Sequence, residues 1–98
     1  MTITKKQNGN ALEIALEGRL DTMTAPELEA ELNGSLDDAE TLTLDFTDLS
    51  YISSAGLRVL LVAQKRMGKK GWMTVTHVGE AIMEIFEVTG FTDILTIE

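Results

Sequence analysis

The chain has 98 residues, a formal net charge of −8, one histidine and no cysteine. This length allows one hydrophobic core, so we expect a single domain over residues 1–98. The lack of cysteine excludes a disulfide framework and a thiolate metal site, and a lone histidine excludes a site with two imidazole ligands. The acidic balance argues against nucleic acid as a partner, because phosphate contacts need clustered lysine and arginine.

The sequence shows no targeting or membrane-spanning segment. The lysines near the N-terminus are not followed by the apolar run of a signal peptide. No stretch reaches the roughly 18 apolar residues of a membrane span. We therefore expect a cytoplasmic protein that does not insert directly into a membrane.

The N-terminal third of the chain predicts a hairpin followed by a helix. Residues 11–17 alternate between apolar and polar, as a half-buried strand does, and residues 2–5 can pair with them across an Asn-Gly-Asn turn signal. A helix is expected to begin at Thr24, with Glu27 completing a capping box, and to stop early at Gly34. Its leucines recur every four residues and form one apolar stripe.

Strands and helices alternate through the rest of the chain. We predict a strand at 41–46, a connection at 48–53, a helix at 54–67, a strand at 72–76, a helix at 79–88 and a strand at 94–97. Such alternation gives parallel neighbours joined by right-handed crossovers. The expected fold is therefore α/β, with a mixed, mostly parallel sheet, helices packed on one face and the order ββαβαβαβ.

Positive charge is concentrated in one segment of this acidic chain. Residues 58–70 contain five bases and no acid, whereas residues 20–57 contain nine acids and no base. Two interpretations stay open. The bases could form a solvated helix face, since cations suit the last turns of a helix, or they could face a partner.

Two serines, Ser53 and Ser54, stand where the predicted central helix begins. One of them is well placed to be the N-cap. The unpaired N–H groups and partial positive charge of a helix N-terminus would stabilise a phosphate there. Gly56, in the first turn, leaves room for a close approach by backbone or by a partner.

The segment Asp48-Leu49-Ser50-Tyr51-Ile52-Ser53-Ser54-Ala55-Gly56-Leu57 resembles the signature of STAS domains, the sulfate transporter and anti-sigma factor antagonist family. Gly18-Arg19-Leu20-Asp21 followed by Thr24-Ala25 is similar to the family's turn before the first helix. Gly90-Phe91 matches the family's end of the third helix. The resemblance covers essentially the whole chain. The short stand-alone members that it most resembles are bacterial anti-sigma factor antagonists.

The resemblance implies that Ser54 is the phosphorylated residue. Ser53 stands where many members have aspartate, and it remains the alternative acceptor, although it suits the cap better. Ala55 stands where serine or threonine is common, and Arg58 where glycine is common. Asp21, in the family's turn before the first helix, is expected at the partner-binding surface.

The resemblance also implies a phosphorylation-controlled partner switch that regulates transcription. Unphosphorylated members bind an anti-sigma factor that is also a serine kinase, and this frees the sigma factor. Phosphorylation of the serine ends the complex, and a metal-dependent serine phosphatase restores it. The alternative is a STAS subunit that acts as a scaffold for an ATPase or permease of a membrane transport system. We expect a monomer or a weak dimer.

A helical wheel sharpens the expected docking face. The outer face of the helix at 54–67 and its basic extension comprises Ser54, Arg58, Leu61, Lys65 and Lys69. Arg58 lies one turn beyond Ser54, where it can pair with a phosphate on that serine. Leu61 is either an apolar anchor for a partner or a scattered surface leucine. The full set expected to bind a partner is Asp21, Ser53, Ser54, Gly56, Arg58, Leu61 and Lys65.

Patterns that would indicate catalysis are weak. Ser54 is not in a Gly-x-Ser-x-Gly elbow, and His77 is expected at a strand end, away from it. The dispersed glycines form no phosphate loop or dinucleotide fingerprint. The Gly-x-x-Gly of residues 68–71 fits a helix end better than a nucleotide clamp, and the glutamates of residues 80–87 fit a solvated face. We expect neither catalysis, nor a metal, nor a cofactor.

Overall fold

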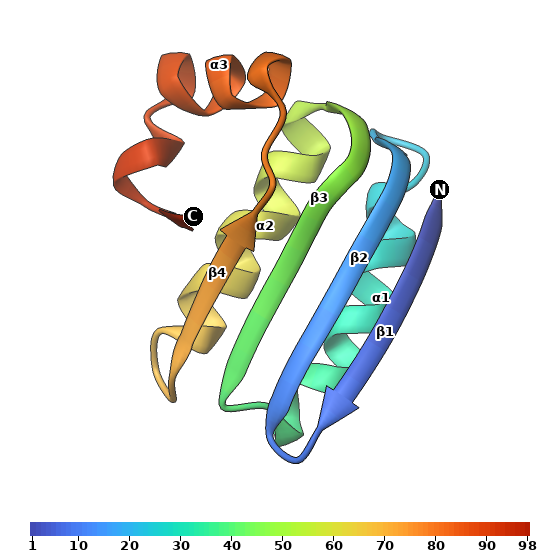
Figure 1. The fold of residues 1–98 in the computed structure, drawn as a ribbon, viewed down its shortest axis with the longest axis vertical. Coiled ribbons are helices and arrows are strands. Elements are labelled where there is room, and N and C mark those ends of the chain that lie inside the picture. The colour runs from blue at the N-terminus through green and yellow to red at the C-terminus, as the bar shows by residue number, and fades with distance from the viewer.

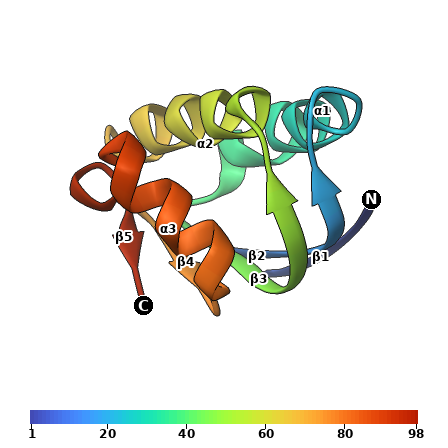
Figure 2. The same cartoon turned by 90° about the horizontal axis from the view of Figure 1, so that it is seen from above.

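The computed structural model describes all 98 residues. One five-stranded sheet runs through the molecule in the order β1-β2-β3-β4-β5, of which Figure 1 labels the first four strands and Figure 2 also labels β5. Its strands are β1 (Thr2–Asn8), β2 (Ala11–Leu20), β3 (Thr41–Ile52), β4 (Trp72–Thr76) and β5 (Thr96–Ile97). β1 and β2 are antiparallel, and each later neighbour is parallel. The predicted mixed, mostly parallel sheet is confirmed.

Three helices complete the fold: α1 (Ala25–Ser35), α2 (Ser54–Met67) and α3 (Glu80–Thr89). α1 and α2 lie side by side over one face of the sheet (Figure 2). α3 crosses the end of the sheet (Figure 1), where the ring of Phe86 packs 6.4 Å from that of Phe46 in β3. None of the helices is both long enough and apolar enough to cross a membrane.

The core lies between the sheet and its covering helices. Twenty-four buried apolar side chains form one continuous cluster. In β2 they alternate at Leu12, Ile14 and Leu16, as the sequence predicts, because successive side chains of a strand point to opposite faces. The leucine stripe of α1 is also confirmed, because Leu28 and Leu32 are buried.

The predicted connection over 48–53 is wrong. β3 continues through Asp48 and Ser50 to Ile52 and stays paired with β2. Opposite Ala15/Glu17 and Gly18/Arg19 of β2, β3 contains one extra residue each time, so that buried residues of β3 become three apart. Residues 48–53 look like a loop in the sequence because a bulged strand loses the regular alternation of buried and exposed side chains.

The boundaries of α1 also differ from the prediction. Thr24 is the N-cap residue, but its side chain makes no capping bond, so the predicted capping box is wrong. Its hydroxyl instead donates to the Arg19 carbonyl at 2.7 Å. Gly34 lies inside α1, which ends at Ser35 and passes into a 3-10 turn, η1 (Leu36–Asp38). Tertiary burial of the leucine stripe outweighs the helix-breaking tendency of one glycine.

The C-terminal elements follow the prediction more closely. α3 ends at Thr89, and its C-cap, Gly90, has a φ of 81° in the left-handed region that suits glycine. A second 3-10 turn, η2 (Phe91–Asp93), follows, and its Phe91 ring stacks 6.3 Å from Phe86. The last strand, β5, is shorter than predicted because only Thr96 and Ile97 pair with β4.

Candidate partner-binding site

Ser53 is the N-cap of α2. Its backbone is extended, with φ −104° and ψ 176°, and its hydroxyl accepts a hydrogen bond from the Gly56 amide at 3.4 Å. Its own amide donates to the Leu20 carbonyl at 2.9 Å. The half-buried Ser53 side chain is therefore committed to the helix start, as N-cap chemistry requires.

Ser54 is the first residue of α2, and its environment is different. Its side chain is exposed and has no hydrogen-bond partner within the chain. It lines a hollow of about 330 Å³ between the first turns of α1 and α2. The other lining residues are Thr22, Ala25, Pro26, Glu29, Ala55, Arg58 and Val59. The structure thus gives the two adjacent serines separate roles: one holds the helix start, and the other faces solvent.

Gly56 explains how α2 approaches the sheet so closely. A Cβ at this position would lie 2.8 Å from both the Leu20 Cγ and the Ile52 Cγ1. Because Gly56 is buried against these strand ends, the close approach foreseen in sequence is made by the chain's own residues. Its packing against these strand ends sets the position of Ser54.

The five bases between residues 58 and 70 divide into two groups. Arg66 donates to Asn33 at 2.9 Å and to Asp37 at 3.3 Å, and the Lys70 ammonium donates to the Leu36 carbonyl. These two side chains fasten α2 and the turn after it to the end of α1. Arg58, Lys65 and Lys69 are exposed and form no ion pair. Part of the basic segment is therefore structural, and part is free at the surface.

The exposed apolar residue of α2 is Val62 rather than Leu61. Val62 is 48% exposed, whereas Leu61 is half-buried. Val62 borders a shallow apolar groove between α1 and α2 that also includes Leu32 and Ala63. An ideal helical wheel misses this because it takes no account of which neighbour covers each flank of the helix.

The turn between β2 and α1 is organised around Asp21. Its carboxylate accepts hydrogen bonds from the amides of Met23 at 3.0 Å and Thr24 at 3.1 Å. The pKa of the Asp21 carboxyl lies below its ordinary value, and the hydrogen bond from the Thr24 amide is the main cause. The positive charge of Arg19, 3.6 Å away, lowers this pKa further. Asp21 therefore shapes this turn next to the Ser54 hollow, which Thr22 also lines.

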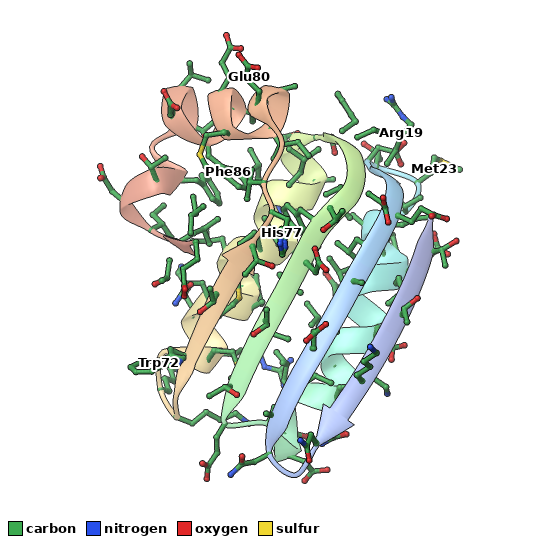
Figure 3. The ribbon with its side chains drawn as sticks, viewed as in Figure 1. Arg19, Met23, Trp72, His77, Glu80 and Phe86 are labelled. Carbon is green, nitrogen blue, oxygen red and sulfur yellow. The ribbon has the colours of Figure 1, made fainter.

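Two surface features near Ser54 were not foreseen in sequence. Met23 projects from the turn with 84% of its surface exposed. The Arg19 guanidinium lies 4.1 Å from the centre of the Tyr51 ring, a cation–π stack between β2 and β3. Figure 3 shows Arg19 and Met23 at the same end of the sheet. A lone methionine in a polar turn was the available signal, but periodicity carries no information about turns.

His77 and Gly71, the last residue of the Gly-x-x-Gly at residues 68–71, belong to the framework of the fold. The His77 Nδ1 lies 3.3 Å from the Asp45 Oδ1 and 3.2 Å from the Thr76 hydroxyl, so its partners are in the sheet rather than at Ser54. Gly71 packs so tightly that a Cβ would overlap the Glu40 carbonyl. No three acidic or imidazole side chains gather closely enough to hold a metal ion.

Comparison with known proteins places this geometry in a family. A family profile described as "Mlab, STAS domain" matches residues 3–96. Because the match spans nearly the whole chain, the chain belongs to the STAS domain family. The resemblance carried by the Ser54 motif is confirmed.

The relatives within that family point to one subgroup. BtrV of Bordetella bronchiseptica, named as an anti-sigma factor antagonist, is 34% identical over 99% of this chain and 85% of its own length. An anti-sigma-B factor antagonist of Bacillus subtilis is 29% identical over 99% of this chain and 90% of its own length. The crystal structure of an anti-sigma factor antagonist from Mycobacterium paratuberculosis has a TM-score of 0.88 at 23% identity, covers 98% of this chain and 83% of that chain, and has the same fold. These names do not favour the transport-scaffold alternative.

Proposed function

We propose that this chain is an anti-sigma factor antagonist whose binding is switched off by phosphorylation of Ser54. In the unphosphorylated form it binds an anti-sigma factor that is also a serine kinase, and the sigma factor is released to transcription. The full-length relatives that bear the antagonist name support this function. The observation that carries the mechanism is the contrast between the engaged Ser53 hydroxyl and the free Ser54 hydroxyl.

The acceptor must offer an accessible oxygen to a kinase. Transfer moves the γ-phosphoryl group of ATP to the Ser54 Oγ, with ADP as the leaving group and loss of the hydroxyl proton. Ser54 can react without disturbing a bond of the fold, because its hydroxyl has no partner. Phosphorylation of Ser53 would remove the capping bond to Gly56 and would have to occur at a half-buried side chain.

A phosphate on Ser54 would change the docking face by its charge. It adds about −1.5 to −2 charges beside an exposed arginine, Arg58, and opposite Glu29 across the same hollow. A partner that docks against the bases of α2 would then meet repulsion and a desolvation cost. The complex dissociates without a change of fold, and a serine phosphatase restores the binding form.

The residues of the proposed docking face contribute in different ways. Arg58 and Lys65 are exposed on α2 and can contact the partner directly. Asp21, Ser53 and Gly56 position the turn and the helix start. The half-buried Leu61 supports the helix flank. The chain acts by binding rather than catalysis, in the cytoplasm where ATP-dependent kinases work, as a monomer or weak dimer and with no cofactor.

The test is direct phosphorylation. The protein, its Ser54→Ala variant and its Ser53→Ala variant are incubated with ATP and each anti-sigma factor kinase of the same organism. Mass spectrometry then maps the modified residue. We expect phosphate on Ser54 in the wild type and in Ser53→Ala, and none in Ser54→Ala. Phosphate on neither serine of the wild type would refute the switch.

A further inference from the structure

Met23 is the most exposed of the large apolar side chains in this chain. It is 84% exposed, more than Val88 at 78% or Trp72 at 68%. In Figure 3 its side chain extends outward from the turn between β2 and α1, beside Arg19. An apolar side chain held in water is stabilised when a partner buries it, so the exposed Met23 is available as a contact for a partner.

The turn that carries Met23 is fixed by hydrogen bonds. The amide of Met23 itself donates to the Asp21 carboxylate at 3.0 Å. The Thr24 hydroxyl donates to the Arg19 carbonyl at 2.7 Å and accepts from the Asp21 amide at 2.9 Å. Because the backbone is already ordered, little conformational entropy remains to be lost there when a partner binds.

The turn and the Ser54 surface form one continuous region. Thr22, the residue before Met23, lines the same hollow as Ser54 and Arg58. The end of β2 is also bonded to the start of α2 through the Leu20 carbonyl and the Ser53 amide. A partner that reaches Ser54 therefore meets the turn at the same end of the molecule.

We propose that Met23 is an apolar anchor of the docking face and selects the kinase partner. The occupant is the ATP-binding anti-sigma factor kinase, which would present an apolar pocket for Met23 bordered by a carboxylate for the unpaired Arg58. This inference rests on the proposed function and adds a specificity residue to it. A flexible, polarisable thioether adapts to such a pocket, and a fully desolvated central anchor typically dominates the energy of an interface.

The two next most exposed apolar residues, Trp72 and Val88, do not line the hollow that Ser54 and Thr22 share. Trp72 stands at the opposite end of the sheet from Met23 (Figure 3). Val88 projects from α3 and is almost as exposed as Met23. Val88 is therefore a matched control, because the same substitution there changes exposed apolar surface outside the proposed face.

The first experiment measures the affinity of the full chain for the anti-sigma factor kinase of the same organism. We expect Met23→Asp to weaken binding about 10- to 100-fold. Val88→Asp should stay within about twofold of the wild type, since it lies outside the interface. Met23→Leu should retain most of the affinity because it keeps the apolar volume. Equal thermal unfolding of the variants verifies that the substitutions leave the fold intact.

The second experiment uses the unmodified protein. Hydrogen peroxide transfers one oxygen atom to a methionine sulfur, giving the sulfoxide and water. Of the five methionines, Met67 and Met73 are buried and Met1 and Met83 are half-buried, so Met23 should oxidise first in the free chain. Saturating kinase should slow oxidation of Met23 about tenfold or more if the side chain enters a pocket.

The outcomes separate this inference from the function on which it rests. A wild-type chain that does not bind the kinase refutes both. A wild-type chain that binds, together with a Met23→Asp variant of equal affinity and a Met23 that the kinase leaves unprotected, refutes the anchor alone. The anchor is supported if Met23→Asp loses affinity for the kinase while Val88→Asp does not, and if the kinase slows oxidation of Met23.

Discussion

The amide of Ser53 donates a hydrogen bond to the Leu20 carbonyl at 2.9 Å, so the first turn of α2 is tied to the last residue of β2. Leu20 is also where the turn that carries Met23 begins, and its side chain packs over Gly56. The contact of Leu20 with the start of α2 therefore positions both parts of the proposed docking face, the turn that carries Met23 and the first turn of α2. Their relative geometry is fixed before any partner arrives.

Gly56→Ala tests how tightly that junction is packed. The added methyl group would meet side-chain carbons at 2.8 Å on two sides, so we expect a loss of about 1–3 kcal/mol in the free energy of unfolding. Gly34→Ala is the matched control, because a Cβ there meets nothing within 4 Å in the interior of α1. It should stabilise by about 0.5–1 kcal/mol. Urea unfolding measures both; equal effects would contradict the packing argument.

The two serines should respond differently to truncation. Ser53→Ala removes the N-cap bond and should cost about 1 kcal/mol of stability. Ser54→Ala removes an exposed hydroxyl without a partner and should change stability by less than about 0.5 kcal/mol. Ser53→Asp should retain stability, because aspartate is also a good cap. A larger stability loss in Ser54→Ala than in Ser53→Ala, measured by thermal unfolding, would reverse the assignment of roles.

Two carboxyl groups should give the fold a specific acid sensitivity. The pKa values of Asp21 and Asp45 lie below their ordinary value of 3.8, chiefly through the Thr24 amide and the Thr47 hydroxyl. A lowered folded-state pKa gives stability that is present above the unfolded-state value and is lost as pH falls through the folded-state value. Unfolding measured across this range should show that the gap between wild type and Asp21→Asn is constant near neutral pH and narrows below about pH 4. A gap that is independent of pH would contradict the assignment.

Arg58 should hold the phosphate once Ser54 is modified. Arg58 lies four residues after Ser54 on the same helix, where an i,i+4 pair can form. In the phosphorylated chain, Arg58→Ala should raise the second pKa of the phosphate, because the charged form loses its partner, and should change its rate of removal by phosphatase. Phosphorus NMR across pH measures the pKa. Lys65→Ala, two turns further along, should leave it unchanged.

Much of the fold could be predicted because its signals are local and repeated. Alternation in β2, leucine spacing in α1 and the helix at 54–67 each follow from one period and one buried face. The continuation of β3 could not be predicted, since bulges within β3 change which of its residues are buried. The Thr24 hydroxyl was predicted to accept from a helix amide, but it donates to the Arg19 carbonyl, which comes near it only after the turn forms.

The motif of the candidate site could be predicted from the sequence, but the residues that surround it in the structure could not. The Ser54 motif is contiguous, so it could be recognised from the sequence. Met23, the Arg19–Tyr51 stack and the exposure of Val62 depend on how β2, β3 and α1 meet in space. The division of the bases depends on the same packing, because Arg66 finds its acceptors in a different helix.

The free hydroxyl of Ser54 has a kinetic consequence for the proposed switch. Since no bond of the fold involves that hydroxyl, the modified and unmodified chains need not cross an unfolding barrier to interconvert. The time a molecule spends in each state is then set by the turnover of the kinase and the phosphatase alone. Such a chain is a rigid binding module that can be phosphorylated and dephosphorylated many times during its lifetime.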